Sequence, residues 1–248
     1  MLKAQAASAR KQAEAERDEL HAKTAKMLAG EREGLPRLTV HEYFSRKGAQ
    51  IYGDIRQGLH GRANIPVFDA EDNLQSVQDI FPDGRKQFAT DAKMKGGRLV
   101  CGTLKDGEDI NLFEGYATAA SGYESGIGAC VCCFFGSNLA VVAADLRARY
   151  PNSFIRIAGD LDAHGAGEKY AKAALAETMP NSAMILPTFS DGRESGDFND
   201  LHQFAGLSEV REQLEAARSD SAQSDGAVDA DAHPTKFDAP VAPQRRDR

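Results

Sequence analysis

Acidic side chains follow three apolar segments between residues 109 and 200, each at the point where a strand is expected to end. These residues are Glu114, Asp160, Asp162, Asp197 and Asp200. Because open parallel sheets bind ligands beyond the carboxyl ends of their strands, we expect these side chains to gather at one edge of a sheet. Mg²⁺ takes one or two carboxylates, keeps waters and accepts substrate phosphates as further ligands. The pattern therefore predicts a site for Mg²⁺, or for Mn²⁺ in its place.

Asp160 and Asp162 stand two residues apart, in the segment FIRIAGDLDAHGAGE (154–168). If strand geometry continues through them, both side chains lie on one face, where two like charges raise a pKa unless a cation lies between them. The alternative is that an aspartate here, or after the last strand, caps the next helix. Glu114 is harder to explain in this way, since a glutamate that closes an apolar strand is costly. His164 is expected to be a loop residue and no ligand.

The elements that must position these carboxylates alternate between strand and helix from residue 109 onward. Four short apolar strands, each followed by a helical segment, predict a parallel sheet covered by helices on both faces. The preceding segment, 65–104, has short strand candidates separated by turn residues and predicts a small antiparallel meander. Before it, Thr39 and Glu42 suggest a capping box for a short helix that stops at Gly48. The overall expectation is an α/β fold.

Composition narrows the classes of protein. The sequence of 248 residues has no apolar run that could span a bilayer, and a charged, alanine-rich stretch follows Met1, so a cytoplasmic protein without membrane contact is predicted. Segment 1–35 is rich in Ala, Glu, Lys and Arg and predicts an exposed or partner-docking helix. Segment 219–248, rich in Ser, Asp, Ala and Pro, predicts a disordered tail. The four cysteines are expected to be buried thiols and no zinc site; they are Cys101, Cys130, Cys132 and Cys133.

Three segments resemble, in this order, the Toprim domain of plasmid- and phage-type DNA primases, relatives of the bacterial replicative primase. FEGYATAAS is similar to the Toprim glutamate motif, AGDLD to its DxD motif, and GDFNDLH to the acidic segment after the last strand in this primase branch. The upstream segments HEYFSRKGAQIYGDIR and NIPVFDAEDNLQSVQDIFPDGRKQFATDAKMKGG resemble the region before Toprim in these primases. The resemblance covers residues 36–217 and divides the chain into a first helix (1–35), a primase-like β-rich subdomain (36–104), a Toprim catalytic domain (105–218) and the tail.

The resemblance implies a Mg²⁺-dependent nucleotidyltransferase that makes short primers on single-stranded DNA from nucleoside triphosphates, for plasmid or phage replication or transfer. It implies that Glu114 is the general acid/base, that Asp160 and Asp162 hold the metal, and that Asp197 and Asp200 help to complete the site. A metal that neutralises phosphate charge and a carboxylate that handles a proton suit this chemistry. A helicase or another replication or transfer protein is a possible partner on this reading.

Basic residues in the first half could hold the template or the incoming nucleotide, or could be scattered surface charges. They are Arg46, Lys47, Arg56, Arg85, Lys86, Lys93, Lys95 and Arg98. The sequence departs from the replicative primase pattern at Ala117 and Thr118, where that pattern has a further aspartate. Two other functions remain open: a Toprim nuclease that uses the same metal set, and a non-catalytic nucleic-acid-binding accessory protein.

Overall fold

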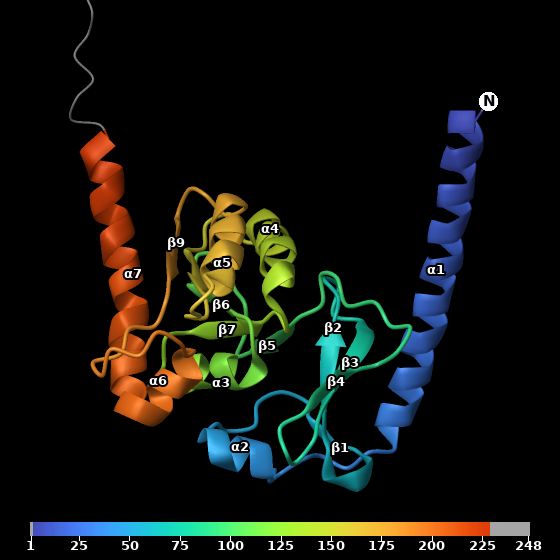
Figure 1. The fold of residues 1–248 in the computed structure, drawn as a ribbon, viewed down its shortest axis with the longest axis horizontal. Helices are drawn as coiled ribbons and strands as arrows, with labels where there is room; N and C mark the ends of the chain where they lie inside the picture. The colour runs from blue at the N-terminus through green and yellow to red at the C-terminus, as the bar shows by residue number, and fades with distance from the viewer. Residues whose placement is uncertain (1, 229–248) are drawn as a thin grey trace, which may run out of the picture.

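Helix α1 (Leu2–Glu33) begins the chain in the computed structural model, which describes residues 2–228. Thr24, Leu28 and Arg32, spaced by four, form its buried stripe and pack beside strand β3 (Leu74–Ile80), while most other positions are exposed. The Arg32 guanidinium donates to the backbone oxygens of Asn64 (2.9 Å) and Asp54 (2.5 Å). Only the C-terminal part of α1 is therefore anchored, and the rest projects from the body (Figure 1).

An antiparallel sheet follows, in the order β1-β2-β3-β4. Its other strands are β1 (Arg56–Gln57), β2 (Ala63–Phe68) and β4 (Lys86–Phe88), with a 3-10 turn η1 (Leu59–Gly61) after β1. Helix α2 (Glu42–Lys47) precedes it and ends at Gly48, whose φ of 61° suits glycine, as expected. The capping box expected at Thr39 and Glu42 is wrong, because His41 occupies the N-cap position and makes no side-chain cap.

The second sheet has the order β5-β7-β6-β8-β9, and all its neighbours are parallel except β5 and β7. Its strands are β5 (Leu99–Cys101), β6 (Ile110–Phe113), β7 (Ala129–Cys132), β8 (Ile155–Ala158) and β9 (Ser182–Ile185). The predicted α/β fold with a helix-flanked parallel sheet is therefore confirmed. One assignment is wrong: β5 was expected in the antiparallel meander but pairs with β7 instead. Alternation in a short apolar strand does not specify which sheet it joins.

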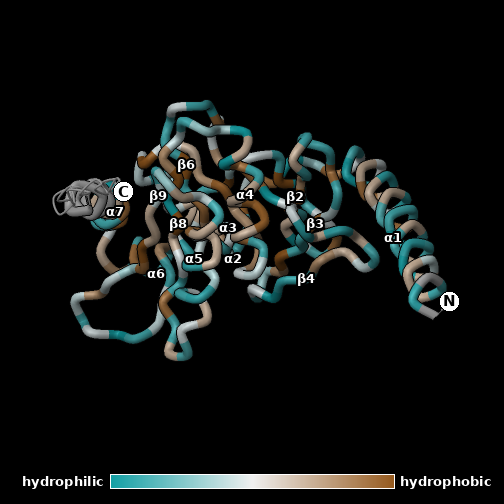
Figure 2. The backbone as a smooth tube through the Cα atoms, turned by 90° about the horizontal axis from the view of Figure 1, so that it is seen from above, coloured by the Kyte–Doolittle hydropathy of each residue, from teal (hydrophilic) through white to brown (hydrophobic). Residues whose placement is uncertain are grey.

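Helices cover both faces of the second sheet. One face packs against α4 (Leu139–Arg149) and α5 (Ala166–Ala176), which lie side by side (Figure 1). The opposite face packs against α3 (Tyr116–Glu124), α6 (Phe198–Ala205) and α7 (Leu207–Val228). Figure 2 shows the most hydrophobic residues in the body of the molecule, whereas α1 alternates between hydrophilic and weakly hydrophobic residues. The short 3-10 turn η2 (Gly136–Asn138) leads into α4.

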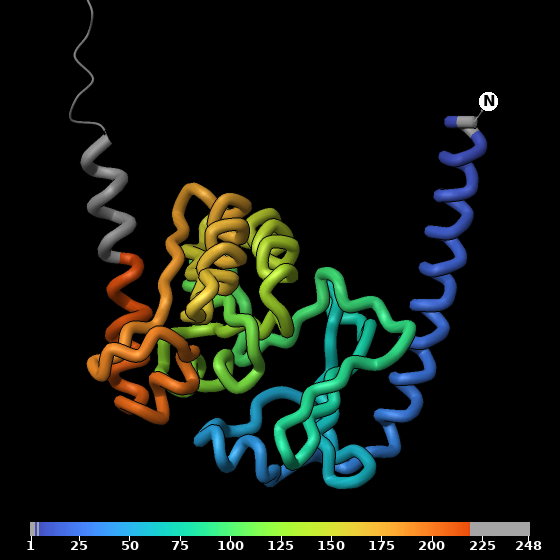
Figure 3. The backbone as a smooth tube through the Cα atoms, in the orientation of Figure 1, coloured from blue at the N-terminus to red at the C-terminus, as the bar shows by residue number. Residues whose placement is uncertain are grey.

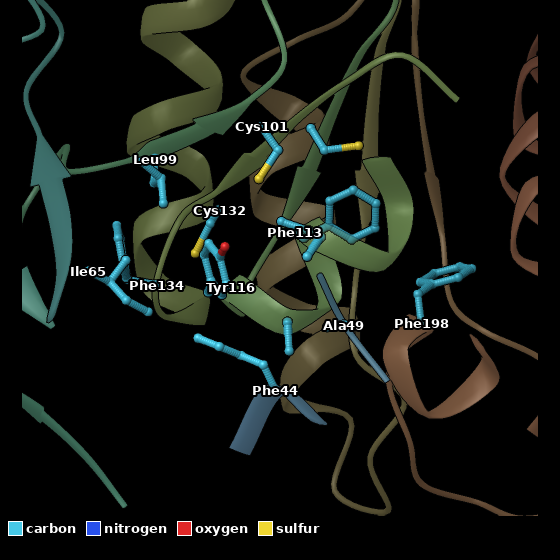
Figure 4. Close-up of a cluster of buried hydrophobic side chains, with 14 of the residues drawn as sticks. Phe44, Ala49, Ile65, Leu99, Cys101, Phe113, Tyr116, Cys132, Phe134 and Phe198 are labelled. Atoms are coloured by element: carbon cyan, nitrogen blue, oxygen red, sulfur yellow. The ribbon is translucent and has the colours of Figure 1, made fainter. Parts of the chain in front are cut away.

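The first lobe (residues 2–88, with the antiparallel sheet) and the second lobe (residues 99–228, with the parallel sheet) share one hydrophobic core. This core fixes one lobe against the other. Figure 4 shows Phe44 and Ile65 from the first lobe beside Leu99, Phe113 and Tyr116 from the second. The rings of Phe44 and Tyr116 are 5.2 Å apart. The Tyr116 hydroxyl donates to the backbone oxygen of Tyr52 (3.0 Å) and accepts from its N–H (2.7 Å). These contacts join residues far apart in sequence, as the path of the chain in Figure 3 illustrates.

The connection between the lobes is also fixed by polar contacts. Asn138 accepts from the N–H of Gly96 (2.8 Å) and donates to the carbonyls of Gly97 and Cys133 (2.8 Å each). The four cysteines are free and buried, as predicted. Burial raises the pKa of Cys101 to about 12, so its thiol is held protonated.

Helix α7 continues to Val228, past residue 218, where the composition predicted the disordered tail to begin. The predicted boundary is therefore too early. A formed helix extends more easily than a new one starts, and segment 219–225 contains neither glycine nor proline to stop it. The rest of the predicted tail, 229–248, lies outside the described residues. None of the helices in the described part of the chain is long and apolar enough to cross a membrane.

Candidate active site at the carboxyl edge of the parallel sheet

Glu114 lies directly after β6, at the carboxyl edge of the parallel sheet, and is half-buried. Burial raises the pKa of its carboxyl, and the negative charges of Asp197 and Asp162 act in the same direction. Lys86 and a hydrogen bond from the Gly136 N–H lower the pKa of this carboxyl and partly offset that rise. A carboxyl with a raised pKa, next to a cation, is suited to accept or donate a proton.

Asp160 lies two residues after β8, the neighbour of β6, and carries the largest carboxylate perturbation in the site. Burial, followed by the charges of Asp197 and Glu114, raises its pKa to about 7, although Lys86 opposes the shift. Its Oδ1 is buried and has no hydrogen-bond partner among the described residues. An unpaired buried carboxylate oxygen is costly unless a cation or a proton satisfies it. A bound cation would therefore satisfy the Oδ1 of Asp160 and stabilise its negative charge.

Asp162 has the opposite environment. Its Oδ1 accepts from the N–H groups of His164 (2.9 Å) and Ala166 (3.1 Å), and its Oδ2 accepts from the N–H of Gly167 (2.6 Å). These bonds, led by that from Gly167, lower the pKa of Asp162. The chain leaves strand geometry after Ala158, so the two aspartates do not share one strand face. The alternative of an aspartate that caps the next helix applies to Asp162, whose carboxylate accepts hydrogen bonds from the first N–H groups of α5.

Replacing Asp162 with alanine should destabilise the fold without removing the chemistry. The N–H group of His164 and those of Ala166 and Gly167 in the first turn of α5 would lose their acceptor, so the urea midpoint at pH 7 should fall. Because the folded pKa is lowered, this stabilisation is present above the ordinary Asp pKa and is lost as the pH falls through the folded value. The midpoints of the wild type and Asp162→Ala should therefore converge in strong acid. Equal midpoints at pH 7 would contradict the capping role.

Asp197 and Asp200 also cap a helix. Asp197 accepts from the Asp200 N–H (2.8 Å) and Asp200 accepts from the Asp197 N–H (3.1 Å), which forms a capping box at the start of α6. Asp197 additionally accepts from the Thr118 hydroxyl (3.2 Å), and Asp200 pairs with the Lys47 ammonium (2.9 Å). Burial acts to lower the pKa of Lys47, but the bond to Asp200 and the charge of Asp197 raise it. Both aspartates therefore combine capping with proximity to Asp160.

The geometry of the carboxylates supports only part of the predicted Mg²⁺ site. Across the described residues, no group of three or more His, Cys, Asp and Glu side chains is disposed to hold a metal ion. Asp162 and the Asp197–Asp200 pair are engaged with helix N-termini. Asp160 nevertheless fits a cation, because its Oδ1 is unpartnered and carboxylates surround it. Since Mg²⁺ is often bound by one or two carboxylates together with substrate phosphates, the metal stays a prediction centred on Asp160.

Lys86 brings a positive charge from the first lobe to the carboxylates of the second. It belongs to β4, and its charge affects the pKa of both Glu114 and Asp160. Its ammonium lies 5.8 Å from the centre of the Tyr43 ring. Close by in sequence, Arg85 lies 4.4 Å above the Phe81 ring. Sequence reasoning included Lys86 among eight basic candidates, but only the packing of the two lobes distinguishes it.

The remaining basic candidates divide by exposure. Arg98 is 4% exposed and is bound to Asp145 (2.5 Å) and to the carbonyl of Ala70 (3.2 Å), so its assignment to nucleic-acid binding is wrong. Arg56 is engaged by Asp54 (2.7 Å) and by the carbonyl of Leu35 (3.0 Å). Both make structural contacts: Arg98 is buried and needs its partners, and Arg56 is half-buried. The exposed candidates are Arg46, Arg85, Lys86, Lys93 and Lys95, and Lys47 is half-buried.

Glycines shape the site in ways that the sequence analysis missed. A Cβ on Gly167 would lie 2.1 Å from the backbone oxygen of Asp160, so only glycine allows α5 to begin so close to this residue. Gly136 supplies the N–H that bonds Glu114. Leu161 and Gly196 exchange two backbone hydrogen bonds of 2.9 Å, which joins the two acidic loops. The repeated glycine in GAGE, after the aspartates, was the available signal for a close approach.

Comparisons with known proteins place the sequence beside primases. No family model matches it. Two proteins named DNA primase TraC, both from Escherichia coli, are similar to it: one is 30% identical over 190 residues (73% of this chain, 18% of that protein) and the other 33% identical over 199 residues (76% and 14%). The chain is thus homologous to a segment of DNA primase TraC and spans less than a fifth of the length of these relatives.

Solved primase structures also align with the chain. The primase fragment of the bacteriophage T7 primase-helicase protein aligns with a TM-score of 0.49 and 17% identity, over 70% of this chain and 69% of that one. The Escherichia coli primase catalytic core gives a TM-score of 0.46 and 17% identity, over 83% and 77%.

Proposed function

We propose that this chain, homologous to a segment of DNA primase TraC, is the catalytic part of a primase-type nucleotidyltransferase with a Toprim-like active site. It would make short primers on single-stranded DNA from nucleoside triphosphates, for the replication or transfer of a plasmid or phage. The observation that carries the proposal is the unpartnered, buried Asp160 oxygen between Glu114, Asp197 and Lys86. In this arrangement Asp160 is suited to bind a cation, Glu114 can accept a proton, and Lys86 provides a positive charge for phosphate.

The residues have distinct roles in this proposal. Asp160 would hold Mg²⁺ or Mn²⁺, and Asp197 stands near enough to assist; when bound, the ion would neutralise phosphate charge and polarise the reacting phosphoryl group. Glu114 would accept the proton of the attacking 3′-hydroxyl. The bond from that oxygen to the α-phosphorus forms while the bond to the β-phosphate oxygen breaks, and pyrophosphate leaves. Lys86, which faces the carboxylates from the first lobe, would hold the phosphates.

A primer-synthesis assay tests the proposal. The protein is incubated with single-stranded DNA, labelled nucleoside triphosphates and Mg²⁺ or Mn²⁺, in parallel with Glu114→Gln. Template-dependent products that disappear in the variant support the primase. Shortened template with no new product identifies a Toprim nuclease instead. Intact DNA binding without any product identifies a non-catalytic accessory protein, and either of these outcomes would overturn the proposal.

Lys86→Ala should weaken the binding of template or nucleotide and reduce its dependence on salt. Removal of one phosphate contact is expected to lower the slope of log K against log [salt] by about 1. Fluorescence anisotropy with labelled single-stranded DNA or a labelled triphosphate, at several salt concentrations, measures this slope. Lys105→Ala is the matched control, because Lys105 is an exposed lysine in the turn before β6 and pairs with Glu108. Equal slopes in the wild type and Lys86→Ala would remove Lys86 from the phosphate site.

A further inference from the structure

Thr118 lies in the first turn of α3, four residues after Glu114. It is 2% exposed, and its hydroxyl donates to Asp197 Oδ2 over 3.2 Å. A Cβ on Gly115 would lie 3.3 Å from Thr118 Oγ1, so the hydroxyl lies over the start of α3, beside the residue that follows Glu114. Since a buried hydroxyl needs a hydrogen-bond partner, this bond links α3 to the carboxylate at the start of α6.

Both carboxylate oxygens of Asp197 are held, by donors from two different helices. Oδ1 accepts from the Asp200 N–H (2.8 Å) in the capping box of α6, and Oδ2 accepts from Thr118. Among the described residues, no other group donates a hydrogen bond to this carboxylate. The terminal torsion of an aspartate is broad, so one bond leaves the plane of its carboxylate loosely defined. The second bond, from Thr118, fixes that plane.

The backbone beside Asp197 is also tied to the candidate active site. Gly196 exchanges two hydrogen bonds of 2.9 Å with Leu161, the residue after Asp160. The negative charge of Asp197 raises the pKa of both Asp160 and Glu114, which places its carboxylate near both. The contact with Leu161 therefore sets where the backbone lies, and the orientation of the Asp197 side chain is left to its own hydrogen bonds.

The two capping aspartates differ in how well they can meet a cation. Asp200 forms an ion pair with the Lys47 ammonium (2.9 Å), which balances its charge. Asp197 forms no ion pair with any described residue, and its one side-chain donor is the neutral hydroxyl of Thr118. A hydroxyl orients a carboxylate without cancelling its negative charge. Asp197 therefore keeps the charge that a divalent cation requires of an oxygen ligand.

We infer that Thr118 is a positioning residue, which orients Asp197 as the second carboxylate for the ion held by Asp160. The inference rests on the metal site proposed above and specifies that Asp197, in place of Asp200, assists Asp160. Groups that hydrogen-bond a ligating carboxylate fix its orientation, and their removal typically weakens metal affinity by about 10–100-fold.

Titration of the full chain with Mn²⁺, without template or nucleotide and with free Mn²⁺ measured by electron paramagnetic resonance, tests the inference. Thr118→Val keeps the branched shape but removes the donor, and should weaken Mn²⁺ affinity by about tenfold or more. Thr118→Ser keeps the hydroxyl and should bind like the wild type. Thr178→Val is the matched control, because Thr178 is also buried and its hydroxyl donates to the carbonyls of Ala174 (3.3 Å) and Leu175 (3.1 Å), beyond the far end of α5. This control should leave Mn²⁺ affinity unchanged.

A double-mutant cycle distinguishes positioning from a general loss of structure. Asp197→Ser removes the carboxylate but keeps a side chain that caps a helix well. If Thr118 acts through Asp197, Thr118→Val should have little further effect on Mn²⁺ affinity once Asp197→Ser is present. Effects that simply add would overturn the inference. Thr118→Ala repeats the cycle with a smaller side chain, so the result does not depend on how well one variant folds.

The outcomes separate this inference from the proposed function. Mn²⁺ affinity that Thr118→Val leaves unchanged, while Asp160→Asn lowers it, overturns the positioning role and leaves the primase intact. The predicted coupling in a protein that makes no primers supports the positioning role and overturns the primase. The absence of any Mn²⁺ binding that depends on Asp160 overturns both the metal site and the role of Thr118.

Discussion

Asp160→Asn is expected to abolish nucleotide incorporation while making the metal-free protein more stable. The amide keeps the shape of the carboxyl group but cannot hold a divalent cation with a full negative charge. Loss of several kcal/mol of charge stabilisation at the reacting phosphate corresponds to a decrease in rate of about 10³-fold or more. Single-turnover incorporation at saturating Mg²⁺ measures this loss, and a titration with Mn²⁺ should show weakened metal affinity.

The gain in stability follows from the pKa of Asp160, which is about 7 in the folded chain. Well below the ordinary Asp pKa of about 3.9 the carboxyl is protonated in both the folded and the unfolded chain, so it does not favour either state. As the pH rises toward 7 the unfolded chain ionises first, and the fold is progressively destabilised by its buried carboxyl. The advantage of Asp160→Asn should therefore be small at pH 4 and reach roughly 2–4 kcal/mol at pH 8.

Urea unfolding in EDTA at both pH values measures the difference in the free energy of unfolding. Asp191→Asn is the matched control, because Asp191 is exposed and its pKa is lowered by Arg193 instead of raised. That substitution should not stabilise the protein and should leave incorporation unchanged. If Asp160→Asn is less stable than the wild type at pH 8, the carboxyl is satisfied in a way that the structure does not show. If it retains incorporation, Asp160 is not the metal ligand.

Glu114→Gln is expected to lower the rate of incorporation by about 10²–10⁴-fold, the usual contribution of a positioned general base. Burial raises the pKa of Glu114, which suits it to take a proton from the 3′-hydroxyl, and glutamine cannot accept that proton. Removing a negative charge next to the phosphates should not weaken binding. The effect should therefore fall on the chemical step, with the affinity for template and nucleotide equal or higher.

Glu108→Gln provides the control for Glu114→Gln. Glu108 is exposed, lies in the turn before β6 and pairs with Lys105. Rapid-quench measurement of the chemical step, together with separate binding titrations, distinguishes catalysis from affinity. A Glu114→Gln protein that incorporates nucleotides at the wild-type rate would exclude Glu114 as the base. A protein whose defect lies entirely in nucleotide affinity would assign Glu114 to binding.

Much of the fold could be predicted from local patterns, because each pattern has a local cause. Alternating apolar strands and helices from residue 109 onward indicated the parallel sheet, and the alanine-rich composition indicated α1. Partner choice could not be predicted in this way. The sequence of β5 resembles the strands of the antiparallel sheet that precede it. It pairs instead with β7, and the segment before it is fixed by the bonds from Arg98 to Asp145 and from Asn138 to the carbonyl of Gly97. Such contacts join residues far apart in sequence, so no local pattern records them.

The set of acidic residues and their order along the chain were determined by the sequence alone. Glu114, Asp160 and Asp197 follow β6, β8 and β9, and parallel topology brings the ends of these strands to one edge. Only the tertiary structure decided what each carboxylate does. Asp162, two residues from Asp160, is satisfied by the N–H groups of His164, Ala166 and Gly167. The Oδ1 of Asp160, near Glu114 and Asp197, is buried and unpaired. Desolvation and neighbouring charge set these roles, and both depend on packing between elements that the sequence separates.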